Sequence, residues 1–150
     1  MQRFMMIMLL VPWLVAAGDD PEPAKPKQNK NTKTAEISLS EVKALVDAGQ
    51  FKSAVKKGLK LAKAEKNAEA YNLVGYSYRK LKSYKKSIKA YKLALKYDPD
   101  LHQAKEYLAV AYLNTGKTKR AKKLYNELKK DAPELADMLK KEADKLNITL

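Results

Sequence analysis

The chain matches itself when it is shifted along its own sequence so that Tyr78 falls on Tyr112. The same shift superimposes Tyr91 on Tyr125 and Pro99 on Pro133. Small residues also fall on small residues, as Gly75 does on Ala109. A period of this length is typical of stacked helix pairs, because a single helical hairpin cannot bury its apolar face alone. The sequence therefore predicts an all-α domain of antiparallel helical hairpins.

The helical pattern begins near Ile37 and continues almost to the end of the chain. Ser38 and Glu41 form a capping box, which is a start signal for a helix, and Gly49 ends this first segment. Six further helices are expected over residues 51–66, 68–82, 84–97, 101–115, 118–131 and 133–146. The last helix should dock on the preceding pair through its apolar residues, Leu135, Leu139, Ala143 and Leu146.

Residues 68–101 resemble the tetratricopeptide repeat family. The residues that carry the resemblance are Tyr71, Val74, Gly75, Tyr78, Ser87, Tyr91, Ala94 and Pro99. Residues 102–135 repeat the pattern with Leu108, Ala109, Tyr112, Gly116, Ala121, Tyr125 and Pro133. Residues 36–67 are a degenerate repeat, which is one residue short and has Lys66 in place of proline. The resemblance implies a short right-handed solenoid of stacked antiparallel hairpins over residues 36–148, with a capping helix at 134–147.

The resemblance also implies a concave groove, which the first helix of each repeat lines. Carried over by motif position, the partner-binding residues are Glu69, Asn72, Tyr76, Arg79, Lys80, Gln103, Glu106, Val110, Leu113 and Asn114, and the degenerate repeat adds Lys43, Val46 and Asp47. Aromatic and aliphatic residues among polar ones suit an extended peptide or a helix of a protein partner. A solvated face without a ligand is the alternative. Tyr76 and Val110 replace residues of the family's carboxylate clamp, so that clamp is not expected.

Positive charge is concentrated in the second helix of each expected pair. The formal net charge is +14, and residues 84–97 contain five Lys and no acidic residue. The family fold would place these helices on the convex face, which could then attach to an anionic membrane surface, an envelope polymer or an acidic protein. A coat that only keeps the protein soluble is the alternative. Nucleic acid is not expected as a partner, because core packing accounts for the repeat tyrosines. Self-association by stacking is a further option.

The N-terminal residues have the layout of an export signal. Residues 1–18 contain Arg3, an apolar run from Phe4 to Val15, and then small residues, which together are typical of a secretory signal peptide. Residues 19–35 contain three prolines and almost no apolar side chain, so we expect a disordered linker. These features predict a periplasmic or secreted protein; an uncleaved N-terminal anchor is the alternative.

The residues suited to catalysis are sparse. The chain has no Cys and a single His, His102, which excludes thiol nucleophiles and clusters of His or Cys around a metal. No phosphate-binding loop or zinc-protease motif occurs in the sequence. We therefore expect neither a catalytic residue, a metal nor a cofactor. The function that the sequence predicts is an exported scaffold that binds a protein through its groove, with electrostatic attachment through the basic face as the alternative.

Overall fold

The computed structural model describes residues 37–150, and these residues form seven α-helices without a strand. The helices are α1 (Leu39–Asp47), α2 (Phe51–Glu65), α3 (Ala68–Lys80), α4 (Tyr84–Tyr97), α5 (His102–Leu113), α6 (Thr118–Asp131) and α7 (Pro133–Lys145). The last six agree with the ranges expected from the sequence to within two residues at each end. The predicted signal peptide, residues 1–18, and the predicted linker, residues 19–35, lie outside the described residues.

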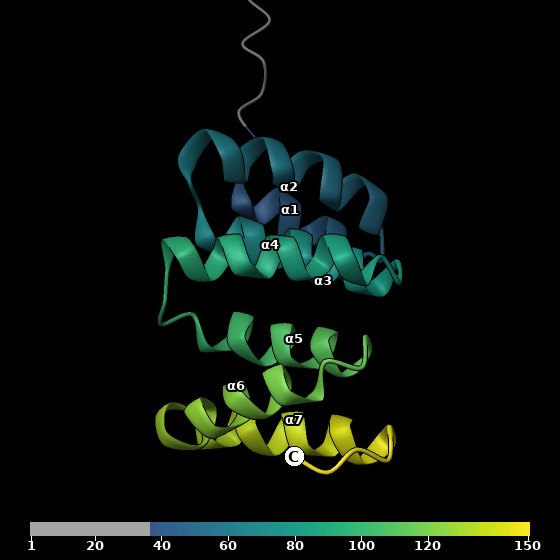
Figure 1. Ribbon diagram of the computed structural model, residues 1–150. Coiled ribbons are helices and arrows are strands. Elements are labelled where there is room, and N and C mark those ends of the chain that lie inside the picture. Colours follow the sequence, from purple (N-terminus) through teal and green to yellow (C-terminus); the bar gives the residue numbers. More distant parts are fainter. Residues whose placement is uncertain (1–36) are drawn as a thin grey trace, which may run out of the picture. The chain divides into compact units, whose positions relative to one another are not determined.

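The helices pack as successive hairpins, α1 with α2, α3 with α4 and α5 with α6, and α7 packs against both α5 and α6 (Figure 1). The first helices α1, α3, α5 and α7 also contact one another in sequence, whereas the second helices α2, α4 and α6 make no such contacts within the described part of the chain. The first helices therefore form the closely packed inner layer, and the second helices form the more widely spaced outer layer. The predicted all-α fold of stacked hairpins is confirmed.

Small residues allow the two helices of the central hairpin to approach closely. A Cβ atom added to Gly75 would lie 2.6 Å from the ring of Tyr91, which is completely buried. Ser87 and Ala94, on the same face of α4, are also fully buried. The tetratricopeptide-like pattern of small residues beside large aromatic ones thus has a direct steric cause in this chain.

The helix α7 covers the end of the stack through Ala136, Leu139 and Ala143, which are buried. The expectation that Leu146 would dock beside them is wrong, because this side chain is 42% exposed. Helix α7 ends at Lys145, and the backbone then turns through Asn147, whose φ is 55°. Beyond this turn, Ile148 and Leu150 pack against the core. None of the helices in residues 37–150 is both long enough and apolar enough to span a membrane.

The N-caps of α3 and α4 give a paired test of local stability. The Asn67 side chain accepts a hydrogen bond of 2.9 Å from the backbone N–H of Ala70, whereas the described structure shows no capping bond from the Ser83 side chain. We expect Asn67→Ala to lower the free energy of unfolding by about 1 kcal/mol, since a backbone donor loses its partner. Ser83→Ala should change it by less than about 0.5 kcal/mol. Urea unfolding followed by circular dichroism checks both values, and equal losses would contradict the capping role of Asn67.

Candidate binding groove

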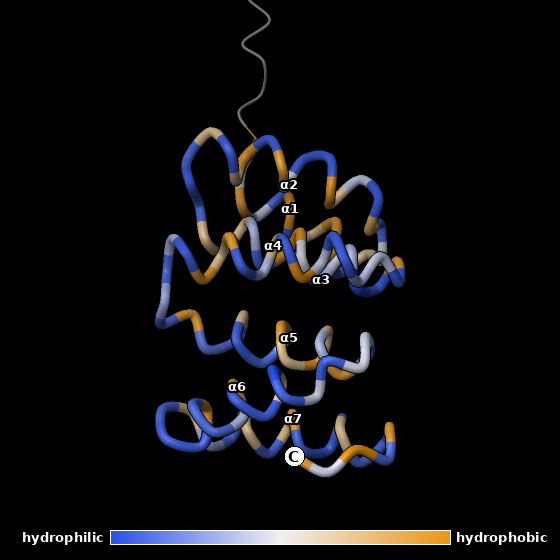
Figure 2. Tube along the Cα trace, viewed as in Figure 1, coloured by the Kyte–Doolittle hydropathy of each residue, from blue (hydrophilic) through white to orange (hydrophobic). Residues whose placement is uncertain are grey.

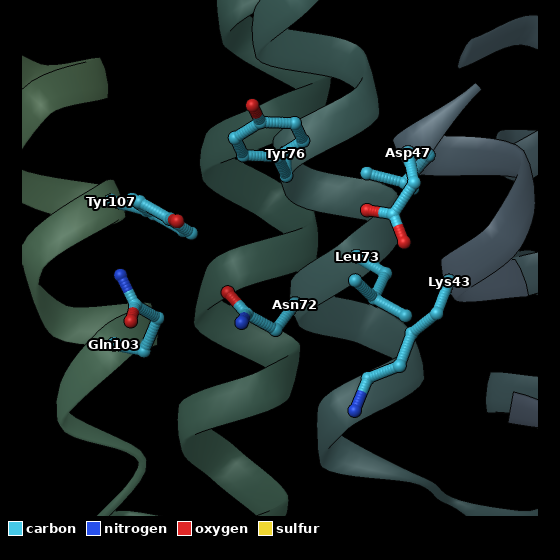
Figure 3. A pocket seen from close by; sticks show the side chains of 8 residues that line it. Lys43, Asp47, Asn72, Leu73, Tyr76, Gln103 and Tyr107 are labelled. Carbon is cyan, nitrogen blue, oxygen red and sulfur yellow. The ribbon is translucent and has the colours of Figure 1, made fainter. Parts of the chain in front are cut away.

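Two hollows lie side by side along the inner layer of helices. The first, of about 420 Å³, is lined by Lys43, Val46 and Asp47 of α1, Asn72, Leu73 and Tyr76 of α3, and Gln103 and Tyr107 of α5 (Figure 3). The second, of about 640 Å³, is lined by Tyr76, Arg79 and Lys80 of α3, Glu106, Tyr107 and Val110 of α5, and Met138, Lys141, Glu142 and Lys145 of α7. Tyr76 and Tyr107 line both hollows. The hollows therefore adjoin at these two tyrosines, and we call the pair the candidate groove.

The middle of the groove is built from two tyrosines and an arginine, which we call the Tyr-Arg cluster: Tyr76, Arg79 and Tyr107. The two rings lie 5.4 Å apart between centroids, and the Arg79 guanidinium lies 5.1 Å from one ring centroid and 5.2 Å from the other. Tyr76 and Arg79 are three residues apart in α3, so they share one face of the helix. A cation held over aromatic faces is attracted by the ring quadrupole. The cluster therefore offers flat apolar surface and positive charge at one point.

Lys80 makes a second set of cation–π contacts, which includes Phe51 of α2. Its ammonium lies 5.7 Å from the Tyr76 ring centroid and 6.0 Å from that of Phe51, and the Phe51 ring meets the Tyr76 ring edge-on at 6.3 Å. Lys80 is exposed, and neither Lys80 nor Arg79 forms an ion pair within the described residues. The Lys80 ammonium is therefore available to an anionic group of a ligand, whereas Arg79 lies close enough to the Glu106 carboxyl to lower its pKa.

Buried polar atoms lie behind the Tyr-Arg cluster. The Nε of Arg79, the Oη of Tyr91 and the Oγ of Ser87 are all buried, and residues 37–150 supply no hydrogen-bond partner for them. Burial raises the pKa of Tyr91, and the nearby charge of Arg79 opposes this shift. The tyrosine therefore stays neutral at physiological pH and does not neutralise the charge of Arg79.

The carboxyl group of Glu106 is almost completely buried. It is only 3% exposed, and its Oε2 accepts a hydrogen bond of 3.3 Å from the Gln103 amide. Burial raises its pKa to about 7, and the carboxylate of Glu142 adds to the shift, while Arg79 and Gln103 act in the opposite direction. Desolvation dominates because it disfavours the charged form. The charge of the groove consequently changes near neutral pH.

The first hollow presents amide groups together with the exposed carboxylate of Asp47, which forms no ion pair within the described residues. The Oδ1 of Asn72 is buried and has no hydrogen-bond partner within residues 37–150. The Gln103 amide lies opposite it, across the space between α3 and α5 (Figure 3). Lys43 at the far side is paired with Glu69 at 2.6 Å. An amide side chain can donate and accept at once, which suits the N–H and C=O groups of an extended peptide backbone.

The structure places ten of the thirteen sequence-derived groove residues around the two hollows. Glu69, Leu113 and Asn114 line neither of these hollows. Glu69 is held in its ion pair with Lys43, and the Asn114 amide donates to the carbonyl of Val110 at 2.8 Å. Leu113 is only 3% exposed and belongs to the hydrophobic core. The inward position assigned to Leu113 is therefore corrected: α5 contacts α4, α6 and α7, and this packing covers the last turns of α5.

The sequence analysis did not identify two parts of the groove lining. One is a motif position that recurs in successive repeats, and the other is the side of the groove that α7 forms. Leu73, Tyr107 and Lys141 line the hollows and occupy the same position of the repeat, each one period after the last. The same repeat offset that predicted the fold could have identified them. Met138 and Glu142 belong to α7, which was expected only to cap the stack. Its inner side is also the last wall of the second hollow.

The described residues contain no cluster of three or more acidic or His side chains that could hold a metal ion. The groove lining combines aromatic rings, side-chain amides, cations and carboxyl groups.

Comparison with known proteins agrees with the helical-repeat fold. The sequence model of the tetratricopeptide repeat family matches residues 68–101. The structure is similar to MamA (residue 41 to its end) from Desulfovibrio magneticus RS-1, with a TM-score of 0.63, 20% identity, and coverage of 68% of this chain and 59% of that chain. It is also similar to an RS-1 MamA double mutant designated ArsTM, with a TM-score of 0.56, 20% identity, and coverage of 71% and 56%.

This chain thus spans less than two thirds of the length of either MamA structure. Among curated proteins, none matches it in sequence. The family match and the shared fold concern the same helices, since α3 and α4 lie within residues 68–101. Residues 68–101 are therefore a tetratricopeptide repeat, and the chain has the fold of a tetratricopeptide repeat protein.

Proposed function

We propose that this protein is an interaction scaffold whose groove holds an extended segment of a partner protein. One observation supports the proposal: two hollows, lined by residues of α1, α3, α5 and α7, adjoin at Tyr76 and Tyr107. Repeat solenoids use extended concave surfaces of this kind for binding. The groove has aromatic residues at its centre and polar residues around them, as protein interfaces commonly do.

The side chains along the groove indicate the chemistry of the segment. The amides of Asn72 and Gln103 can pair with its backbone in the first hollow. An aromatic or aliphatic side chain can lie against Tyr76 and Tyr107, and an acidic group can meet Lys80. We therefore expect an extended segment that carries an apolar side chain followed by an acidic one.

A variant that removes the centre of the groove tests this function. Tyr76→Ala combined with Lys80→Ala should release the partner, because these residues supply the aromatic surface and an exposed cation. The matched control is Tyr84→Ala with Lys85→Ala, which removes the same residue types from α4, away from both hollows. The measurement is crosslinking and mass spectrometry of proteins captured in the native compartment by each full-length variant. Circular dichroism of each variant verifies folding.

The wild type and the control should capture the same partner, and the groove variant should lose it. A partner list that is unchanged by the groove variant would eliminate the groove as the binding site.

A second candidate function is electrostatic attachment through the outer layer. The helices α2, α4 and α6 carry most of the positive charge, and α4 has five Lys without an acidic residue. In Figure 2 the outer helix α6 is hydrophilic over most of its length. Exposed charges are screened within ~8 Å at physiological ionic strength. Binding to phosphatidylglycerol vesicles should therefore vanish at moderate salt, and salt-insensitive binding would count against this candidate.

We also propose that the protein acts after export from the cytoplasm. The proposal is supported by the sequence of residues 1–18, whose charged start, apolar run and small residues are typical of a signal peptide. N-terminal sequencing of the chain purified from its native compartment tests it. A new N-terminus after Ala17 or Gly18 is expected, and an intact Met1 would argue for the uncleaved anchor.

A further inference from the structure

Two additional hollows open on the outer side of the stack, away from the groove. One, of about 180 Å³, lies between α2, α3 and α4 and includes Leu59, Tyr78, Lys86, Lys89 and Leu93 in its lining. The other, of about 400 Å³, lies between α4, α5 and α6 and includes Lys92, Tyr112, Arg120, Lys123 and Leu124. We call them the outer hollows. Each is flanked by two consecutive helices of the outer layer.

The outer hollows are repeat copies of each other. Three positions of the first recur one repeat period later in the second: Tyr78 as Tyr112, Lys86 as Arg120 and Lys89 as Lys123. The geometry recurs with them, since the Lys86 ammonium lies 5.7 Å from the Tyr78 ring centroid and the Arg120 guanidinium lies 5.7 Å from that of Tyr112. The same arrangement of a tyrosine and two cations is thus built twice on one surface, whereas Glu127 stands in the second hollow at the repeat position of Leu93.

The charge around the outer hollows is mostly positive, and Glu127, in the second hollow, is the acidic residue among their lining residues. Lys86, Lys89, Arg120 and Lys123 are exposed, and none forms an ion pair within the described residues. The helix α4 separates the two hollows and contains no acidic residue. A partner that lies across α4 therefore meets exposed cations on both sides of the helix, with a recess on each side and one carboxylate, Glu127, in the second recess.

We propose that the outer hollows bind an acidic, amphipathic segment of a partner protein. Its apolar side chains would enter the recesses, against Leu93 in one and Leu124 in the other. Its Asp or Glu carboxylates would pair with Lys89 and Lys123 at the rims. The proposal rests on the second candidate function, attraction of anionic partners to the outer layer, and it adds defined sites and a class of partner.

The shape of the surface favours a protein segment over a membrane. Proteins that lie on a membrane insert protruding apolar side chains below the headgroups. The apolar groups here are mostly recessed: in the described outer helices, the large apolar side chains that are exposed are Leu93 and Tyr97, at 37% and 38%. Recesses with charged rims receive side chains, whereas a lipid surface would contact only the rims.

The test uses the full-length chain and two fluorescent peptides. The first is a helical peptide with Glu and Leu on opposite faces, and the second has Ser in place of every Leu. The hollow variant is Lys89→Gln with Lys123→Gln. Its control is Lys85→Gln with Lys119→Gln, which makes the same charge change at two exposed positions that are also one repeat period apart but do not line these hollows. Fluorescence anisotropy gives the dissociation constants.

The Glu-Leu peptide should bind the wild type, the hollow variant should bind it roughly tenfold more weakly, and the control variant should lose much less. The Ser peptide should bind more weakly than the Glu-Leu peptide to all three proteins.

Equal losses in the two Lys variants, or equal binding of the two peptides, would show diffuse attraction only and overturn the outer hollows as sites. Loss of the Glu-Leu peptide in Tyr76→Ala would place it in the groove and would also overturn the proposal. Binding of phosphatidylglycerol vesicles without binding of either peptide would replace the protein partner with a membrane. Absence of binding to both the peptides and the vesicles at low salt would reject the second candidate function itself.

Discussion

Replacing Tyr91 by alanine is expected to lower the free energy of unfolding by about 3–5 kcal/mol. The side chain is completely buried at the junction of α4 with α3 and α5: its ring fills the space above Gly75 and lies 5.9 Å from the ring of Tyr107. Removal of the ring leaves a cavity between three helices, and the lost contacts add to the lost burial of apolar surface. Chemical denaturation of the full-length protein, followed by circular dichroism, measures the change.

The control is Tyr91→Phe, which keeps the ring and removes the hydroxyl. The Oη atom is buried without a hydrogen-bond partner in residues 37–150, so its removal should change the stability by less than about 1 kcal/mol. A loss in Tyr91→Phe as large as that in Tyr91→Ala would show that the hydroxyl, and not the packing of the ring, holds the hairpin together.

A substitution at Gly75 tests the same contact, because Gly75 packs against the ring of Tyr91. Alanine at this position would bring a Cβ within 2.6 Å of the Tyr91 ring, an overpacking that should cost about 1–3 kcal/mol. In the Tyr91→Ala background the clash is absent, and the higher helix propensity of alanine should instead stabilise by up to about 1 kcal/mol. The sign of the effect of Gly75→Ala should therefore reverse between the two backgrounds, which a double-mutant cycle measures.

The contact between Gly75 and Tyr91 shows why the fold could be predicted from the sequence. The repeat period fixes which small residues meet which large ones, because helix pairs can stack closely only where one side has little volume. The helix starts and ends followed from local signals such as Ser38, whose Oγ accepts a hydrogen bond from the Glu41 backbone at 3.2 Å. The close helix contacts and the helix ends can be predicted because they depend on residues that are near in sequence or one repeat period apart.

The groove was predicted less completely, because it depends on what covers each helix. Positions such as Tyr76 and Lys80 line it as the resemblance implied, whereas the packing around α5 buries Leu113. The polar surface of α7 indicated a cap, but the sequence did not reveal that Met138 and Lys141 would also form a wall of the groove. The basic residues of the outer layer were identified, but the outer hollows were not, because the depth of a recess depends on side chains from three helices at once.

Glu106→Gln is expected to stabilise the protein above neutral pH and to have little effect in acid. The folded protein holds the pKa of Glu106 at about 7, above the ordinary value of 4.5 that we assign to the unfolded chain. Between these pH values the folded state binds more protons than the unfolded state, so this carboxyl group makes stability fall as pH rises from about 4.5 to about 7, with no further change above that range. At pH 8 the cost amounts to at most about 3 kcal/mol, which the neutral amide of glutamine avoids.

The measured quantity is the free energy of unfolding of Glu106→Gln minus that of the wild type. The contributions of the other carboxylates cancel in this difference, because both proteins contain them. Chemical denaturation at several pH values from 4.5 to 8.5 should show a difference near zero at the acid end that grows until about pH 7.5.

The exposed Glu134, in the first turn of α7, provides the control: Glu134→Gln makes the same change of charge without relief of burial, so its difference should stay small. In a Glu142→Gln background the rise should end at a lower pH and reach a smaller maximum, because Glu142 helps to keep the Glu106 pKa high. A difference for Glu106→Gln that does not change with pH would show that Glu106 is ionised at little cost in the folded protein, and would remove the basis for any change of groove charge near neutral pH.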